Sequence, residues 1–89
     1  MIIGKVFRVY GKVQNVGFRF YTQKKALAYH IKGFVKNEAD GSVYIEAEGE
    51  SLSMQAFENW CKQGPTWASV NNFKSNEQPI VNYTDFRIK

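Results

Sequence analysis

The chain has 89 residues, of which 44% are hydrophobic and 16% aromatic, and this composition predicts one domain over residues 1–89 with a single apolar core. No apolar run approaches the ~20 residues of a membrane span, no leader-like segment opens the chain, and the one cysteine, Cys61, can form neither an internal disulfide nor a metal cluster. These features predict a cytoplasmic protein and exclude the membrane-spanning, disulfide-stapled and cysteine–metal classes.

The formal net charge of +4 is divided unevenly along the chain. Residues 1–37 contain lysines and arginines but no acidic side chain, whereas residues 38–58 contain acidic side chains but no basic one. If folding keeps the two stretches apart, an anion that approaches the first stretch meets a positive local field. If folding interleaves them, the surface has mixed sign, and the sequence leaves both outcomes open.

The first third of the chain predicts a strand followed by a helix. Apolar and polar side chains alternate over Lys5–Val13, with Phe7, Val9 and Val13 on one face. Good helix formers without proline predict a helix over Phe18–Tyr29. Its expected inward stripe comprises Phe18, Thr22, Ala26 and Tyr29.

The middle of the chain predicts a hairpin. Gly33–Asn37 and Ser42–Glu48 are expected to be strands, and the Asp40-Gly41 dipeptide between them is typical of a tight turn. In the second strand, Val43, Ile45 and Ala47 alternate with Tyr44, Glu46 and Glu48.

The last part of the chain predicts a second helix and one or two further strands. Leu52, Ala56 and Trp60 recur at four-residue spacing, with Phe57 and Cys61 beside them, and Gly64-Pro65 ends the helix. A weaker strand is expected over Val70–Ser75, and the alternation over Tyr83–Lys89 predicts the last one.

This order predicts an α+β fold, a ferredoxin-like βαββαβ sandwich with two helices on one face of an antiparallel four- or five-stranded sheet. In such a sheet the turn after the first strand and the end of the second predicted strand lie at the same edge. We therefore expect Asn37 to lie near the turn that follows Lys5–Val13. The fold alone does not decide the chemistry, because many functions share it.

The stretch Gly11–Arg19 joins the first strand to the first helix and has the residue types of an anion cradle. The first N–H groups of a helix have no carbonyl partners and lie at the positive end of its dipole. Asn15 and Gly17 reach positive φ at low cost, so successive amides can turn toward one point. Arg19 adds a planar guanidinium, which suits phosphate oxygens. On spacing alone, an ordinary structural turn remains an equal alternative.

The pattern Gly11-x-Val13-Gln14-x-Val16-Gly17-Phe18-Arg19 resembles the signature of the acylphosphatases, small enzymes that hydrolyse the carboxyl–phosphate bond. Gly33–Val43 is similar to a second element of that family, and Gly64-Pro65 followed by Ala68 and Val70 is similar to a third, in the same order. The resemblance implies a metal-independent and cofactor-free monomer. Its substrate would be a small acyl phosphate, and its products a carboxylate and inorganic phosphate.

The resemblance also implies roles for individual residues. Arg19 matches the phosphate-binding arginine of the family and Asn37 its water-positioning asparagine. The backbone amides expected to bind the phosphate are those of Asn15, Val16, Gly17, Phe18 and Arg19. The chain departs from the family in having Asn15 and His30 where glycine is usual. A non-glycine residue at positive φ is destabilising by about 1 kcal/mol, so we expect some lost stability or a shifted helix end at His30.

A nucleic-acid-binding module is the main alternative from another class. The same order of elements describes RNA-recognition domains, the isoelectric point is about 9.3, and Lys32-Gly33-Phe34 opens like their aromatic motif. Lys36, Asn37 and Ala39 then occupy positions where that motif has an aromatic residue, a valine and a second aromatic residue, so its stacking surface is missing. We therefore expect no nucleic-acid partner. A non-catalytic acylphosphatase-like domain is a third possibility, although both candidate site residues are present.

Overall fold

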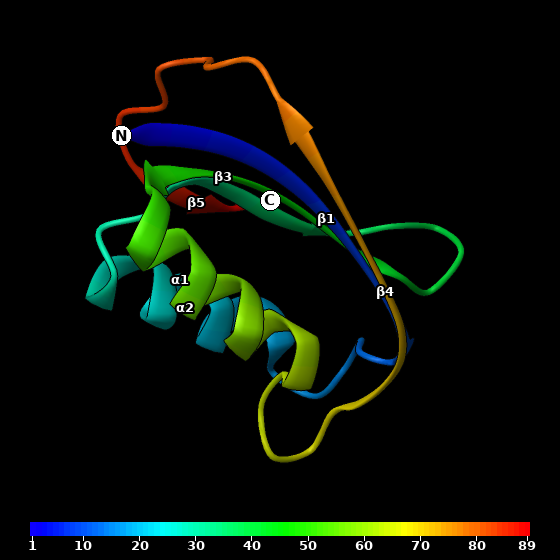
Figure 1. The fold of residues 1–89 in the computed structure, drawn as a ribbon. Helices are drawn as coiled ribbons and strands as arrows, with labels where there is room; N and C mark the ends of the chain where they lie inside the picture. Colours follow the sequence, from blue (N-terminus) through cyan, green and yellow to red (C-terminus); the bar gives the residue numbers. More distant parts are fainter.

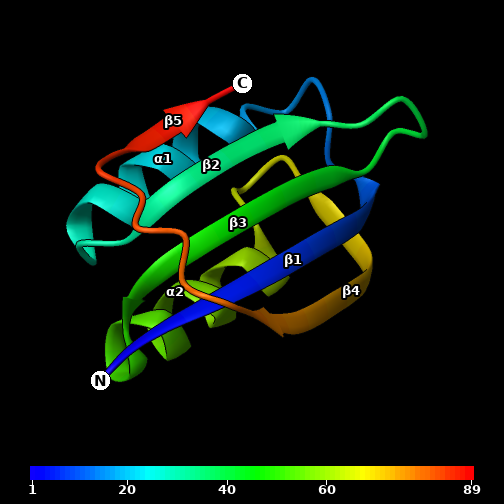
Figure 2. The same ribbon diagram turned by 90° about the horizontal axis from the view of Figure 1, so that it is seen from above.

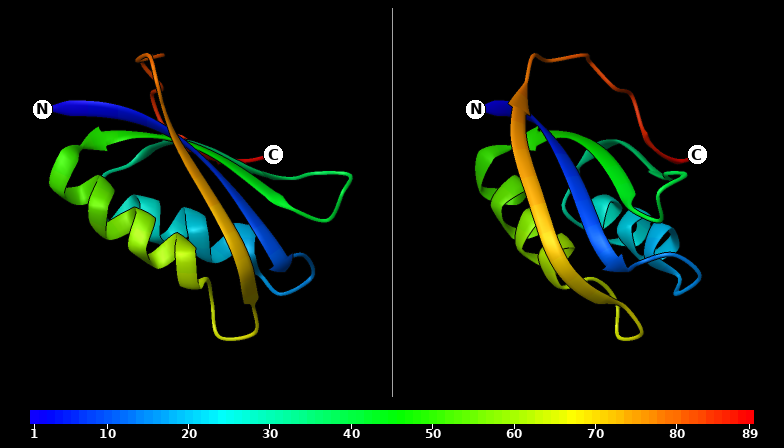
Figure 3. Two further views of the ribbon diagram at one scale, coloured as in Figure 1. Left: turned by 45° about the vertical axis from the view of Figure 1, so that its right-hand side comes forward. Right: turned by 90° about the vertical axis from the view of Figure 1, so that its right-hand side faces the viewer.

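A five-stranded sheet with two helices on one face forms the structure, which is a computed structural model describing residues 1–89. The elements are β1 (Ile2–Lys12), α1 (Phe18–Ala28), β2 (Lys32–Asn37), β3 (Val43–Glu50), α2 (Ser51–Gln63), β4 (Ser69–Gln78) and β5 (Phe86–Ile88). Figure 1 shows the sheet above the two helices, and the strand order, seen in Figure 2, is β4-β1-β3-β2-β5. The two views in Figure 3 show both helices against the same face of the sheet. The ferredoxin-like fold predicted from the sequence is confirmed.

Four of the five strands pair antiparallel, and only the β2–β5 pair is parallel. The parallel pair departs from the purely antiparallel sheet that we expected. It arises because the chain leaves β4 at one edge of the sheet and crosses to the other edge before it forms β5 (Figure 2). Neither helix has the length and apolar composition needed to cross a membrane.

The core lies between the sheet and the helices, and the predicted alternation of β1 and β3 is confirmed. Phe7 and Val9 of β1 and Val43 and Ile45 of β3 are fully buried. The rings of Phe7 and Phe57 lie 6.2 Å apart between their centroids and join the sheet to α2. The side chains on the opposite face of β3 are polar, as the period of two predicts.

The inward stripe of α1 is confirmed at Phe18, Thr22 and Ala26, which are all buried. The Thr22 hydroxyl donates a hydrogen bond to the Phe18 carbonyl oxygen at 2.7 Å, which satisfies this buried polar group inside the helix. Tyr29 lies just beyond the last helical residue and is only partly buried. His30 then adopts the left-handed conformation, with φ at 56°, at the position where we expected a strained helix end.

The inward face of α2 differs from the expected one at Leu52 and Met54. Met54, Phe57 and Cys61 are buried, whereas Leu52 is 80% exposed. Because successive helical residues are about 100° apart, Leu52 points away from the side that carries Met54 and Cys61. Phe57 and Cys61 are buried as expected, and Trp60 is partly buried against the core, so only Leu52 of the expected row lies away from the sheet.

The two last strands differ in length from the expected ones. β4 extends over ten residues, longer than the predicted Val70–Ser75, and β5 has three, fewer than the predicted Tyr83–Lys89. The segment between them, residues 79–85, crosses the sheet face opposite the helices (Figure 2). The apparent alternation over Tyr83–Lys89 therefore includes residues that belong to this crossing segment.

Two carboxylates of β3 fasten the crossing segment to the sheet. Glu48, which is 4% exposed, accepts hydrogen bonds from the backbone N–H groups of Val81, Asn82 and Tyr83. Glu46 accepts hydrogen bonds from the hydroxyls of Tyr44 and Tyr83 and from the Gln78 amide. These bonds fix the path of the chain into β5 and thus the position of the last residues.

The environment of Glu46 stabilises its ionised form. Partial desolvation opposes ionisation, but the hydrogen bonds from Tyr44, Tyr83 and Gln78 and the positive charge of Lys89 outweigh it, so the pKa of Glu46 lies below its ordinary value of 4.5. Desolvation and the hydrogen bond to Glu46 in turn raise the pKa of Tyr44 to about 12, which keeps that hydroxyl protonated as a donor.

We predict that Glu46 makes stability depend on pH in the acid range. Its pKa is lower in the folded than in the unfolded chain, so its contribution is fully present above pH 4.5 and is lost as the pH falls through the folded value. Glu46→Gln should lower the free energy of unfolding at pH 7 by about 1 kcal/mol and flatten its decline between pH 5 and pH 3. Urea unfolding across this range measures both effects.

Glu77→Gln is the matched control, because Glu77 is an exposed residue of the neighbouring strand β4 without an ion pair or side-chain hydrogen bond. It should leave the pH profile of stability unchanged. If the free energy of unfolding declined equally between pH 5 and pH 3 in Glu46→Gln and in the wild type, Glu46 would not be a source of the pH dependence.

Candidate active site

The turn between β1 and α1 has two residues in the left-handed region of backbone space. Asn15 has φ at 62° and Gly17 has φ at 77°. Both residue types were expected to tolerate such angles, and this expectation is confirmed. A β-carbon at Gly17 would also lie 3.3 Å from the ring of Tyr21, so a larger residue there would meet both backbone strain and a close contact.

The N-terminus of α1 is uncapped. Gly17 is the N-cap residue, no side chain bonds to the first turn, and that turn contains no acidic residue. The first amide with a partner in the helix is that of Tyr21, which donates to the Gly17 carbonyl oxygen at 3.1 Å. The amide N–H groups of residues 15–20 donate no hydrogen bond within the chain. This turn is therefore an array of backbone donors without partners in the chain, at the positive end of a helix dipole.

A cavity of about 220 Å³ opens beside this turn. Its lining residues are Val13, Asn15, Gly17, Phe18, Arg19, Phe20, Asn37 and Ile88. Its lining residues come from the end of β1 and the turn after it, the start of α1, the end of β2 and the end of β5. The predicted proximity of Asn37 to the β1–α1 turn is thus confirmed, since Asn37 and Arg19 line one cavity.

The Arg19 side chain is oriented by the end of the chain. Its Nη1 donates a hydrogen bond to the Lys89 carbonyl oxygen at 3.0 Å. The Lys89 N–H in turn donates to the Val35 carbonyl oxygen at 2.8 Å, which continues the parallel pairing of β5 with β2. One edge of the guanidinium is therefore held by the backbone, and the remaining donors of its fork stay available.

Gln14 ties the turn to the β2–β3 hairpin. Its Nε2 donates to the carbonyl oxygens of Glu38 at 2.8 Å and Ser42 at 3.0 Å. Glu38 directly follows Asn37, so these two bonds fix the loop that carries the free amides relative to the strand end that carries Asn37. Sequence reasoning placed Gln14 in the motif but assigned it no role, because its partners are backbone atoms distant in the sequence.

None of the acidic side chains within residues 38–58 lines the cavity. Glu38 pairs with Arg8 at 3.8 Å and Glu58 with Lys5 at 2.8 Å. Glu46 and Glu48 lie against the crossing segment. The charges of the two stretches are thus interleaved on parts of the surface, while Arg19 is the only charged side chain that lines the cavity.

Four of the five residues whose backbone amides were predicted to bind phosphate line the cavity. Asn15, Gly17, Phe18 and Arg19 line the cavity, whereas Val16 is 9% exposed and belongs to the core cluster. Sequence reasoning missed three lining residues, Val13, Phe20 and Ile88. The first two fall in or beside the motif, but nothing in the sequence links Ile88 to it.

Outside this cavity, neither the single cysteine nor any cluster of ligating side chains suits a nucleophilic or metal site. Cys61 is fully buried, and this burial, with the charge of Glu58, raises the pKa of its thiol well above the ordinary value. No group of three or more His, Cys, Asp or Glu side chains could hold a metal ion.

Comparisons with known proteins agree with this geometry. A family model described as Acylphosphatase matches residues 5–88. The acylphosphatase of Actinobacillus succinogenes is 47% identical over 76 residues, which make up 85% of this chain and 84% of that protein. The structure of an acylphosphatase from Coxiella burnetii is 36% identical with a TM-score of 0.95, over 99% of this chain and 93% of that one. The acylphosphatase structure from Bacillus subtilis is 33% identical with a TM-score of 0.95, over 100% and 99%. The chain therefore belongs to the acylphosphatase family, a family of hydrolases.

Proposed function

We propose that the cavity beside α1 hydrolyses small acyl phosphates to a carboxylate and inorganic phosphate. In this proposal the amides of residues 15–19 and the guanidinium of Arg19 bind the phosphoryl group, and Asn37 orients the attacking water. The observation that carries the proposal is the uncapped start of α1, with its unpaired amides, in the same cavity as Arg19 and Asn37.

The phosphoryl group needs a preorganised positive environment, and the cavity offers one. Charge on its oxygens is stabilised in the transition state by donors that are already in place, since they need no reorganisation during the reaction. The free amides supply such donors, and the contact of Arg19 with the Lys89 carbonyl oxygen holds the guanidinium in position. No aspartate or glutamate side chain lines the cavity, so none repels a dianionic group there.

The carboxylate leaving group needs little protonation by the protein. A carboxylate departs with little protonation because its conjugate acid has a low pKa, so the main task is to position a water in line with the bond that breaks. The Asn37 carbonyl oxygen can accept a hydrogen bond from that water, but an amide is too weak a base to take the proton. A phosphate oxygen takes the proton instead. Phe20 and Ile88 provide apolar surface for the acyl part of the substrate.

Asn15 takes the place of the usual glycine without closing the cradle. Its backbone has the left-handed conformation that a glycine would adopt, and its side chain is exposed and makes no hydrogen bond within the chain. We therefore place the effect of this departure on the affinity for substrate and not on the ability to turn it over.

Arg19→Lys tests the role of the guanidinium. A lysine keeps the charge but loses the planar fork, so the variant should fold and lose at least about a hundredfold in kcat/KM, with weaker inhibition by inorganic phosphate. Hydrolysis of benzoyl phosphate, followed by its ultraviolet absorbance with a chelator present, measures the change. Arg87→Lys is the control, because Arg87 pairs with Asp85 outside the cavity. A fully active Arg19→Lys variant, or a folded wild type without turnover, would overturn the proposal.

Asn37→Ala tests the placement of the water. Loss of the amide should lower kcat by about a hundredfold and change the inhibition constant of phosphate by less than about threefold, because the amides and Arg19 still bind the phosphoryl group. The exposed Asn59 of α2 provides the control variant Asn59→Ala. Equal losses in turnover and phosphate affinity would show that Asn37 binds phosphate and does not orient water.

Gln14 is a positioning residue in this proposal, because it sets the distance between the amides and Asn37. Its two bonds bridge segments 24 and 28 residues apart in the sequence, and both are partly buried. The carbonyl oxygens that it contacts keep their backbone donors when the side chain is removed, since Glu38 and Gly41 donate to them. The hairpin should thus persist without Gln14 while its position relative to the turn loosens.

Gln14→Met should lower kcat by about tenfold with little change in the phosphate inhibition constant, and lower the free energy of unfolding by about 1 kcal/mol. The rates are measured well below the melting temperature, where the unfolded fraction is negligible, so a purely structural role would leave kcat unchanged. Gln55→Met, on the exposed side of α2, is the control. Gln14→Asn should not restore kcat, because its shorter side chain cannot reach both carbonyl oxygens.

A further inference from the structure

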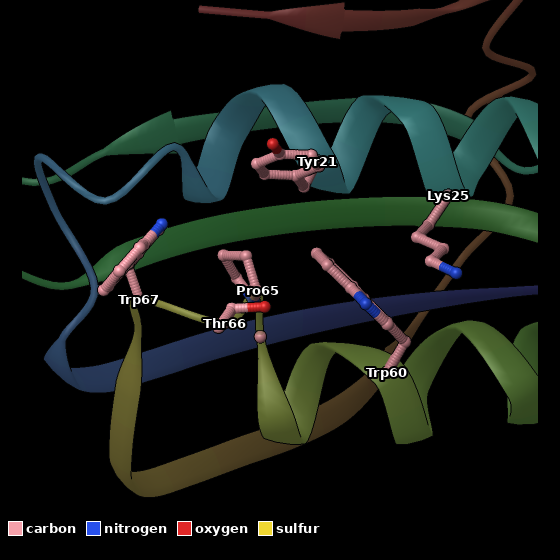
Figure 4. A pocket seen from close by; sticks show the side chains of 7 residues that line it. Tyr21, Lys25, Trp60, Pro65, Thr66 and Trp67 are labelled. Carbon is pink, nitrogen blue, oxygen red and sulfur yellow. The ribbon is translucent and has the colours of Figure 1, made fainter.

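A second cavity, of about 290 Å³, lies between α1, α2 and the loop that follows α2. We call it the tryptophan pocket, and its lining residues are Tyr21, Lys25, Trp60, Gly64, Pro65, Thr66 and Trp67. Figure 4 shows the two indole rings on either side of Pro65 and Thr66, with Tyr21 and Lys25 on the neighbouring helix. The tryptophan pocket shares no lining residue with the cavity that contains Arg19.

Two of the three aromatic side chains of this pocket are exposed, whereas the third, Trp60, is partly buried and packs against the core. Trp67 is 76% exposed and Tyr21 is 43% exposed. The turn that carries Trp67 is closed by a hydrogen bond from the Ala68 N–H to the Pro65 carbonyl oxygen at 3.0 Å. The ring of Trp60 packs against Phe18 with 5.8 Å between the centroids. Exposed aromatic rings that line one cavity are typical of a binding surface.

The polar groups of the pocket select the charge of a ligand. The Lys25 ammonium, the two indole N–H groups and the hydroxyls of Tyr21 and Thr66 can all donate hydrogen bonds, and no carboxylate lines the pocket. Lys25 takes part in none of the ion pairs of the chain. A ligand that accepts hydrogen bonds and carries one negative charge fits this set, whereas the ammonium repels a cation.

We propose that the tryptophan pocket binds a small planar aromatic carboxylate of one or two rings. The ring packs against the aromatic side chains of the pocket, and the carboxylate pairs with Lys25 and accepts hydrogen bonds from the neighbouring donors. The volume of about 290 Å³ is at the lower limit for small-molecule sites, which restricts the ligand to this size. The proposal does not rest on the activity of the first cavity.

The two tryptophans of the chain both line the pocket, so their indole N–H resonances report on it directly. A titration of the 15N-labelled protein with sodium benzoate, at constant ionic strength and with inorganic phosphate present throughout, should shift both resonances until they saturate. Lys25→Gln should raise the dissociation constant by about threefold or more. Trp67→Leu should abolish the shift of the Trp60 resonance; because Trp67 is 76% exposed, this variant should keep the fold.

Lys24→Gln is the matched control, since Lys24 has the same charge change but lies near Phe20 and not in the tryptophan pocket. It should leave the benzoate titration unchanged. Acetate and benzyl alcohol, which lack the ring or the charge, should shift the indole resonances much less than benzoate. The proposal is overturned if benzyl alcohol acts as strongly as benzoate, or if benzoate shifts only the amides of residues 15–19. It is also overturned if the indole resonances move with protein concentration alone, which would assign the surface to a second copy of the chain.

Discussion

The left-handed turn at Asn15 and Gly17 is the constraint on which the first cavity depends. Two positive φ angles within three residues turn the backbone so that α1 begins without a cap and its first amides remain unpaired. The pairing of β1 with both β3 and β4 fixes where this turn starts, and the buried stripe of α1 fixes where it ends. The geometry of the donors is therefore set by the packing of the whole sandwich and not by the turn alone.

Long-range hydrogen bonds then assemble the cavity from three distant parts of the chain. Gln14 connects the turn to the hairpin, and Arg19 connects it to Lys89. Lys89 reaches its place because Glu46 and Glu48 direct the crossing segment over the open face of the sheet. The partners of these polar side chains lie up to 70 residues away. The cavity thus relies on placement of fixed donors, which suits a reaction whose leaving group needs little help.

The parts that the sequence predicted well are those governed by short periods and local turn chemistry. The alternation in β1 and β3, the α1 stripe and the positive φ of Asn15 and Gly17 all follow from residues close in the chain. The meeting of Arg19 and Asn37 followed from topology, because the order of elements places the two strand ends together. The signature was specific enough to indicate the family, since it combines several residue types at fixed spacing.

The parts that the sequence did not predict depend on contacts between distant residues, which produce no periodic pattern in the sequence. Leu52 lies at a plausible helical spacing, but the buried face is chosen by the packing of Met54, Phe57 and Cys61 on the sheet. The short β5 and the path of residues 79–85 follow from hydrogen bonds to two glutamates of another strand. The role of Ile88 and Lys89 beside Arg19 depends on the same path, and no local pattern contains it.

The polar composition of β4 has a consequence for how the molecule behaves in a crowded solution. β4 pairs only with β1, so the outer side of this ten-residue strand offers unpaired backbone groups to other chains. Such edges invite intermolecular pairing and aggregation, and charged or strongly polar side chains discourage it. Exposed Asn72, Lys74 and Asn76 occupy the middle of the strand. The opposite edge, β5, is only three residues long. The residues that made β4 a weak strand in the sequence therefore protect the sheet from growing by addition of another chain.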